Sequence, residues 1–366
     1  MSARAEPALD RSSEPFLGRR SGPTSQVPAA RRGRPSAATV RWALTAGGLI
    51  VTFLMLYIAV RDVHLDDTWD ALGRSHHAWL APALIVFAAS IFLRALRWRM
   101  LFEPSHRPGT RAATRALLVG YLFNSLLPAR AGEAARIVRL RNEACVPRAE
   151  ALATVVVERI FDVLSLLLVL FVALAWLPPV TWFRQAAILA GVLAGAVVIT
   201  TVVLAIFRDR PIRALMRPLG FLPAERVQFA VQHTTRGLVA LRRPAVALGA
   251  FAATMVSWLV MGASFWLLMR GFDFGVDAGA ALLVLVTVNL AMIVPSGPAA
   301  MGVFEAGTVA ALHAYRVPQS HAFSYALVLH ALNFLPFIAA GAWVLFGRTL
   351  TLHLRRLIGL EQRVRS

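Results

Sequence analysis

The feature that most constrains this chain is a series of apolar runs long enough to cross a lipid bilayer. The runs cover residues 42–60, 78–96, 151–176, 186–207, 245–269 and 322–346. A helix needs about 20 apolar residues to cross a hydrocarbon core about 30 Å thick. Only 16% of the residues are charged, which excludes a soluble multidomain enzyme and a disordered protein. We therefore expect an all-α, polytopic integral membrane helical bundle with about six full spans.

The basic residues, all of them arginine, lie between the apolar runs rather than in one nucleic-acid-binding face. The formal net charge is +19, and arginines are concentrated in residues 1–41, 208–243 and after 347. Cytoplasmic loops carry the excess of basic residues, so both termini are predicted to face the cytoplasm. The expected organisation is a disordered basic cytoplasmic arm (1–41), a transmembrane domain (42–346) and a basic cytoplasmic tail (347–366) of a multi-pass plasma-membrane protein.

Two shorter apolar segments are broken by proline and do not resemble ordinary spans. Residues 116–128 have arginines on both sides, so a segment that dips in and returns to the cytoplasm keeps the charge pattern. Residues 279–315 form two apolar legs around a proline-rich break and should enter and leave from outside. Each hairpin forms a unit with the span before it and the span after it, and the two units have opposite orientation in the membrane. The prediction is an inverted repeat with two re-entrant hairpins, or about eight spans if the hairpin legs cross.

The first hairpin carries a polar constellation at its break. Its members are Asn124, Pro128, Arg130, Gly132, Glu133 and Arg136. Pro128 cannot continue a helix, and Gly132 permits a tight turn. The helix that follows would start with its amides directed at the break, where Arg130 and Arg136 could bind a phosphate. The alternative is that these arginines anchor a cytoplasmic boundary, with Glu133 as an ion-pair partner.

The second hairpin repeats the order of these residue types. Its members are Asn289, Pro295, Gly297, Pro298, Gly302 and Glu305. Glu305 has no arginine within ten residues, so it should be neutral or paired across the bundle and should face an internal cavity. A purely structural, hydrogen-bonded glutamate is the alternative. His330 and Asn333 in the last span are weaker signals, and we interpret His330 as a packing residue.

A third constellation is the segment Glu158-Arg159-Ile-Phe-Asp162. Glu158 and Asp162 are four residues apart and share a helix face, where two carboxylates repel one another unless a cation lies between them. Arg130 and Arg136 are the candidate partners. The alternative to a substrate site is a local ion-pair network that locks the hairpin. The lone Cys145 excludes a disulfide framework, and we expect no metal site and no cofactor.

At these residues the chain resembles the bacterial and archaeal flippase-like family that includes the transmembrane region of lysylphosphatidylglycerol synthase. The matching elements are Arg94-Ala-Leu-Arg97-Trp98, which we interpret as a membrane boundary, and residues 124–136, 158–162 and 295–305. The second hairpin departs from the family's usual Pro-Gly-Gly-x-Gly pattern, because Ser296 and Pro298 flank Gly297 here. The resemblance implies movement of anionic or aminoacylated phospholipids, or of polyprenyl-phosphate-linked sugars, between leaflets.

The leading hypothesis is therefore a lipid translocator, not an enzyme, whose partners are membrane lipids and not nucleic acid. Its headgroup site would be formed by Asn124, Arg130, Glu133, Arg136, Glu158, Asp162, Asn289 and Glu305. One alternative is an integral-membrane glycosyl- or lipid-transferase with Glu133, Glu158 or Asp162 as base. Another is a scaffold that does not transport and that binds a partner synthase or glycosyltransferase.

Overall fold

A computed structural model describes residues 37–127, 131–174, 243–293 and 296–364, with a few isolated positions between 175 and 242. Several predicted features lie outside these residues: most of the basic arm, nearly all of the apolar run 186–207, and Pro128, Arg130 and Pro295. All regular structure in the described ranges is helical. The all-α prediction is confirmed, and residues from Trp42 onward form one compact unit.

The longer helices are α1 (Ala37–Val60), α3 (Leu80–Met100), α6 (Arg148–Leu174), α10 (Pro244–Phe272) and α13 (Gln319–Val364). The shorter elements are α2 (Leu65–Arg74), η1 (His77–Trp79), α4 (Thr110–Leu126), α5 (Gly132–Ala144), α11 (Ala278–Ala291), η4 (Pro298–Ala300) and α12 (Val303–His313). Residues His77–Met100, Pro244–Phe272 and Gln319–Gly347 are long and apolar enough to cross a membrane. The count of six spans stays a prediction. The backbone of α13 continues as helix into the predicted tail.

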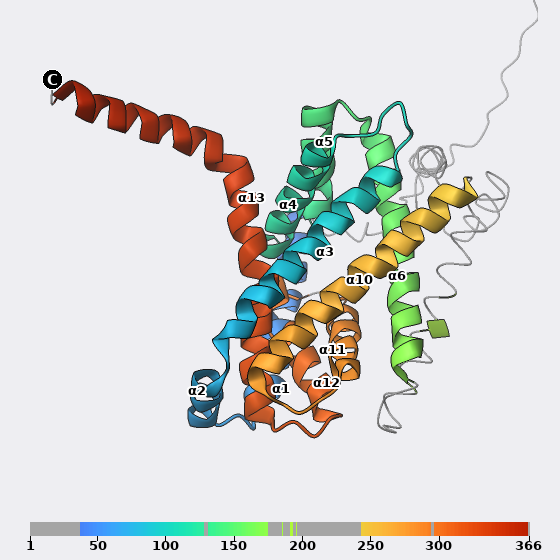
Figure 1. Cartoon of the computed structure of the whole chain (residues 1–366), viewed down its shortest axis with the longest axis vertical. Helices are drawn as coiled ribbons and strands as arrows, with labels where there is room; N and C mark the ends of the chain where they lie inside the picture. The colour runs from blue at the N-terminus through green and yellow to red at the C-terminus, as the bar shows by residue number, and fades with distance from the viewer. Residues whose placement is uncertain are drawn as a thin grey trace, which may run out of the picture. The chain divides into compact units, whose positions relative to one another are not determined.

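Both predicted breaks interrupt the helices. α4 ends at Leu126 and α5 begins at Gly132, although α4 starts at Thr110, before the apolar leg. In the second hairpin, α11 ends at Ala291 and α12 begins at Val303. Figure 1 shows α4 and α5 toward one end of the helices, and α11 and α12 toward the other.

Side-chain packing joins the two hairpins to the long helices on either side. α3 and α10 pack along one another, α4 packs on α13, and α11 packs on α6. At the α4–α13 contact, a Cβ added to Gly341 would lie 2.6 Å from the Cβ of Leu122. Only glycine lets these two helices approach so closely.

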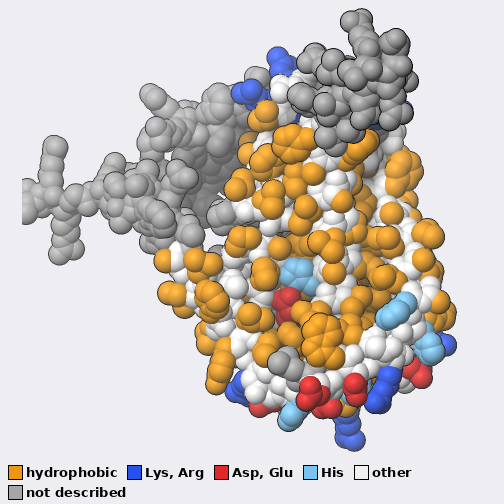
Figure 2. Space-filling model, turned by 90° about the vertical axis from the view of Figure 1, so that its left-hand side faces the viewer, with side chains coloured by type: hydrophobic (Ala, Val, Ile, Leu, Met, Phe, Trp, Pro, Cys, Tyr) orange, Lys and Arg blue, Asp and Glu red, His pale blue; other side chains and the backbone are white. Residues whose placement is uncertain are grey.

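Large apolar side chains cover much of the outer surface. Exposed examples are Phe53, Ile85, Leu335, Trp343 and Phe346. Figure 2 shows hydrophobic side chains over most of one face, with charged side chains gathered at its lower rim. Water-soluble monomers rarely expose such extensive apolar surface, so this face is suited to lipid.

The second break is held against α1. The backbone amide of Gly297 donates to Thr52 Oγ1 at 2.7 Å. Gly302 has φ +80°, and an added Cβ would lie 2.4 Å from the carbonyl oxygen of Thr52. Glycine is required at 302 for both reasons, the left-handed backbone and the close approach.

The first break depends on a second close approach, between α4 and α5. A Cβ on Gly132 would lie 1.8 Å from the carbonyl oxygen of Gly120 and 2.6 Å from Asn124 Oδ1. The first contact cannot be relieved by rotating a side chain, because the Gly120 oxygen belongs to the backbone. The two hairpin legs therefore cannot keep their spacing if residue 132 has a side chain.

We predict that Gly132→Ala destabilises the protein by about 1–3 kcal/mol, the usual cost of overpacking. The thermal unfolding midpoint in detergent measures this effect. Gly73→Ala is the matched control, because a Cβ at Gly73 meets nothing within 4 Å. An unfolding midpoint of Gly132→Ala equal to that of Gly73→Ala would contradict the packing described here.

Candidate functional site

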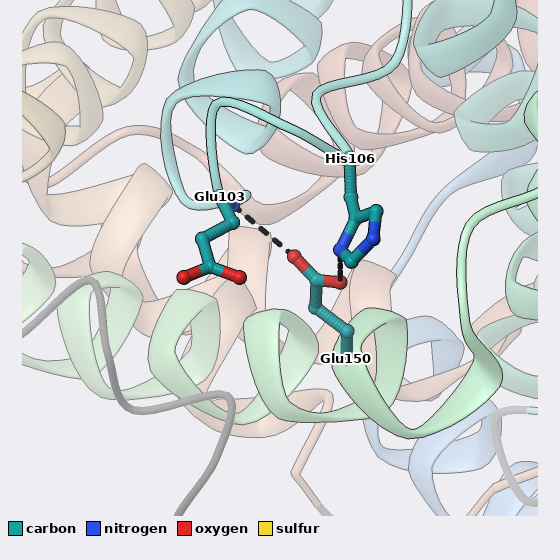
Figure 3. Close-up of side chains that lie close together, drawn as sticks. All are labelled: Glu103, His106 and Glu150. Carbon is teal, nitrogen blue, oxygen red and sulfur yellow. Dashed lines mark hydrogen bonds and ion pairs between the residues drawn. The ribbon is translucent and has the colours of Figure 1, made fainter.

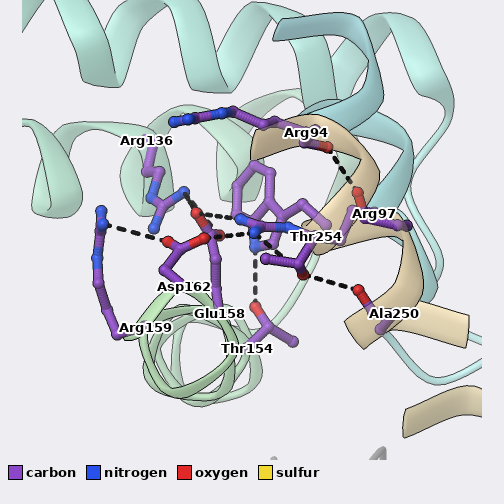
Figure 4. A network of polar contacts seen from close by, with 12 residues as sticks. Arg94, Arg97, Arg136, Thr154, Glu158, Arg159, Asp162, Ala250 and Thr254 are labelled. Atoms are coloured by element: carbon purple, nitrogen blue, oxygen red, sulfur yellow. Dashed lines mark hydrogen bonds and ion pairs between the residues drawn. The ribbon is translucent and has the colours of Figure 1, made fainter. Parts of the chain in front are cut away.

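Six charged side chains meet between α3, α5 and α6. They are Arg97 from α3, Glu133 and Arg136 from α5, and Glu158, Arg159 and Asp162 from α6. Figure 4 labels all of them except Glu133, with α10 along one side. We call these six residues the charge ring, because their ion pairs close on themselves with alternating sign.

Arg97 joins the two deepest carboxylates of the charge ring. Its Nη1 lies 2.6 Å from Asp162 Oδ1, and its Nη2 lies 2.8 Å from Glu158 Oε1. Nη1 also donates to Thr254 Oγ1 of α10 at 3.3 Å. Only 1% of Arg97 is exposed. A buried charge is tolerated when it is paired and hydrogen-bonded in this way, and Arg97 is the closest cation to both carboxylates.

The other half of the charge ring fixes α5 on α6. Arg136 bonds Glu158 and Glu133, each at 3.0 Å. Arg159 pairs with Glu133 and, at 3.4 Å, with Asp162. The Arg159 side chain is 42% exposed, so this side of the ring is the accessible one. Three arginines and three carboxylates leave the charge ring with no net charge.

Trp98 packs beside the charge ring and has no exposed surface. The guanidinium carbon of Arg136 lies 4.9 Å from the Trp98 ring centroid, and Trp98 Nε1 donates to Thr154 Oγ1 at 3.0 Å. The indole ring attracts the cation through its π face while its polar edge is satisfied. Trp98 therefore helps to orient Arg136 toward the carboxylates.

A second buried acidic group lies in the other hairpin. Glu305 Oε2 accepts from the Gly302 amide at 2.7 Å, at the start of α12. Glu305 Oε1 lies 2.6 Å from His330 Nδ1 of α13. Glu305 is only 5% exposed. The carboxylate thus joins the break of its own hairpin to the last long helix.

The two asparagines of the hairpins differ in what they bond. Asn124 Oδ1 accepts from the Gly132 amide at 2.9 Å, across the first break. Asn289 Nδ2 donates to the Leu285 carbonyl of its own helix at 2.7 Å. The common order of residue types is therefore not matched by common contacts.

Over residues 14–341 the sequence matches the family model described as the lysylphosphatidylglycerol synthase transmembrane region. The chain belongs to this family. It is also 30% identical over 120 residues to the glycosyltransferase AglD of Haloferax volcanii. That match covers 32% of this chain and 19% of AglD, so the chain spans a small part of its relative. No solved structure matches the chain.

In this member of the family, the predicted site residues fall into two groups. Glu133, Arg136, Glu158 and Asp162 meet in the charge ring. Arg136 pairs with Glu158 as predicted, but the cation that joins Glu158 to Asp162 is Arg97. Glu305 lies instead between α12 and α13, and Asn289 contacts neither group. Gly132, Gly297, Pro298 and Gly302 lie at the hairpin breaks.

The interpretation of Arg97 and Trp98 as membrane-boundary residues was wrong. Both are buried, because Arg97 is the counter-charge of two carboxylates that lie 61 and 65 residues further along the chain. The available signal was the apolar spacing of Phe87, Ile91 and Ala95, which places Trp98 on an inward helix face. His330 was interpreted as a packing residue, but it also pairs with Glu305.

One further cluster of metal-ligating side chains is found in the described ranges. Ligand atoms of Glu103, His106 and Glu150 lie within 4.8 Å of one another (Figure 3). Both Glu150 oxygens already have partners: Oε1 accepts from the Glu103 amide at 3.1 Å, and Oε2 lies 2.8 Å from His106 Nδ1. These bonds attach the loop between α3 and α4 to α6, which explains the cluster without a cation.

Proposed function

We propose that this protein is a membrane lipid translocator that moves a phospholipid or a polyprenyl-phosphate-linked lipid between leaflets. The observation that carries the proposal is a ring of six charges, four of them buried, inside a helical bundle with an apolar outer surface. Charged side chains in membrane segments are costly, and they commonly mark pathways for polar substrates. Membership of the lysylphosphatidylglycerol synthase transmembrane family supports a lipid-related role.

An inverted repeat would supply alternating access to such a pathway. One unit is α3, the α4–α5 hairpin and α6, and the other is α10, the α11–α12 hairpin and α13. The helix contacts support this pairing. α4 of the first unit packs on α13, the last helix of the second unit, and the equivalent α11 of the second unit packs on α6, the last helix of the first. α3 and α10, the first helices of the two units, pack on each other. Transporters with such repeats bind substrate near broken helices at the repeat interface. The headgroup would then lie near the first break and the charge ring.

The similarity to part of a glycosyltransferase favours a second candidate. In this alternative the chain is an integral-membrane glycosyl- or lipid-transferase, or a scaffold for a partner synthase. The carboxylates that a transferase would need as a base are Glu133, Glu158 and Asp162. All three are already bound to arginine side chains, so none is free to contact a substrate hydroxyl. We therefore favour translocation.

Purified protein in liposomes distinguishes these candidates. We would add fluorescent phosphatidylglycerol and a fluorescent polyprenyl-phosphate sugar in separate samples and follow leaflet exchange by dithionite quenching. Faster exchange than in protein-free liposomes is the expected result. Formation of a new glycolipid or free polyprenyl phosphate, detected by mass spectrometry, would favour the transferase. Neither exchange nor product, in the presence of folded protein, would contradict both the translocator and the transferase and favour the scaffold.

The proposed orientation can be tested with single cysteines. Cys145 is exposed and follows α5, so a membrane-impermeant maleimide should label it only from the cytoplasmic side. In a Cys145→Ser background, Asp67→Cys in the exposed α2 should be labelled only from outside. Labelling intact cells and inverted vesicles measures both positions. Accessibility of position 145 from outside would contradict the cytoplasmic first hairpin and the inverted repeat.

A further inference from the structure

Arg94 lies on α3 one turn before Arg97 and faces the same neighbouring helix. Its Nη2 lies 3.1 Å from Met261 Sδ, and its guanidinium carbon lies 4.3 Å from the Trp258 ring centroid. Arg97 reaches Thr254 of the same α10, four residues before Trp258. Residues three or four apart share a helix face, so both arginines project along one seam between α3 and α10. Figure 4 includes both side chains.

The contacts of Arg94 place its guanidinium far from either end of α10. Met261 follows Pro244 by 17 residues, which is about 25 Å of helix at 1.5 Å per residue. Eleven more residues, or about 16 Å, separate Met261 from the end of α10 at Phe272. α10 is apolar enough to cross a membrane. Arg94 thus brings a charge to the middle of an apolar helix.

Arg94 forms no ion pair with any residue in the described ranges. It is close enough to Asp162 for their charges to attract, but the two Asp162 oxygens are already paired with Arg97 and Arg159. Because the charge ring is neutral, Arg94 gives this part of the bundle one surplus positive charge. A guanidinium has five N–H donors, and a thioether is a weak acceptor for one of them.

Arg99, on the same helix, shows what a satisfied arginine looks like here. Its Nε donates to the Pro108 carbonyl at 2.8 Å, and its Nη1 donates to Thr110 Oγ1 at 2.7 Å. It also lies in the last turn of α3, where a positive charge is favoured by the helix dipole. Arg94 has neither advantage. Its stacking on Trp258 orients the guanidinium, and no oxygen acceptor for its hydrogen-bonding edge is found among the described residues.

We propose that Arg94 binds the phosphate group of the transported lipid at the α3–α10 seam, with Trp258 holding the guanidinium plane in place. Phosphate offers several oxygens to a guanidinium fork and supplies the missing negative charge. The carboxylates of the charge ring do not oppose this, because each is already neutralised. This inference rests on the proposed lipid function and places the phosphate of the substrate on α3, beside α10, rather than only at the hairpin break.

The test is lipid binding by purified full-length protein in neutral detergent. We would measure the dissociation constant of fluorescent phosphatidylglycerol and of a diacylglycerol with the same chains. Arg94→Gln should weaken phosphatidylglycerol binding at least tenfold and leave diacylglycerol binding unchanged. Arg99→Gln, the matched control, should leave both unchanged. Equal phosphatidylglycerol binding by wild type and Arg94→Gln would overturn the inference.

Two further measurements complete the test. If Arg94→Gln does not fold, Arg94→Lys keeps the charge but loses the planar fork, and it should still weaken phosphatidylglycerol binding; wild-type affinity in that variant overturns the inference. Inorganic phosphate tests the source of the ligand: weak competition at millimolar concentration supports a lipid headgroup, and tight competition would overturn the lipid assignment. Arg94-dependent binding without leaflet exchange would contradict the translocator proposal and retain the phosphate site.

Discussion

Replacing Arg97 with methionine should leave little folded protein. Asp162 and Glu158 would lose their closest contacts with a cation, at 2.6 and 2.8 Å, while remaining buried. Removing one partner of a buried ion pair commonly costs about 3–5 kcal/mol, and here two carboxylates are affected. We expect reduced abundance in the membrane and a strongly lowered unfolding midpoint, measured by fluorescence-detected gel filtration after heating.

The same experiment needs a surface pair for comparison. Arg74 and Asp70 are 3.2 Å apart with side chains 81% and 66% exposed, so Arg74→Gln should change stability by less than about 1 kcal/mol. The double variant Arg97→Met, Asp162→Asn restores neutrality and should recover part of the loss. Wild-type stability of Arg97→Met alone would show that the charge ring is not a determinant of folding.

Glu305→Gln should fold normally and lose most of its lipid transport. The glutamine oxygen can still accept from the Gly302 amide, and its amide nitrogen can still donate to His330, so stability should change by no more than about 1 kcal/mol. The negative charge is what the variant lacks. If Glu305 binds a cationic headgroup or takes up a coupling proton, the variant cannot do so. Leaflet exchange in proteoliposomes across pH, with thermal stability on the same samples, measures both effects.

Glu103→Gln is the matched control for Glu305→Gln, because Glu103 is an exposed acid in the loop between α3 and α4 and should be dispensable for transport. Full exchange by Glu305→Gln with an unchanged pH profile would restrict Glu305 to a structural role. Loss of stability together with transport would lead to the same conclusion.

The helical membrane character and the positions of both breaks could be predicted from local sequence. Apolar runs of bilayer length and proline beside glycine act on the backbone within a few residues, so their effect does not depend on distant parts of the chain. The buried polarity of Glu305 was predictable on the same basis, since no arginine lies near it in sequence.

The partners of these charges could not be predicted in the same way. Arg97 is near the end of an apolar run, and an arginine at that position commonly extends toward the interface. Its burial depends on Glu158 and Asp162 of α6, which come within bonding distance only because α3 and α6 both pack on α10. Arg94 illustrates the same limit. That it forms no ion pair within the described ranges is clear only when each carboxylate of the charge ring has been assigned its arginine partners.

The contact between Gly341 and Leu122 also bears on the order in which the protein is assembled. Gly341 follows Leu122 by 219 residues, so at about 5–20 residues per second the ribosome needs about 10–45 s to supply it. During that interval the face of α4 that later receives α13 is without that helix. A chain arrested before Gln319 would keep that face uncovered by α13. The first hairpin is therefore made well before the helix that completes its packing.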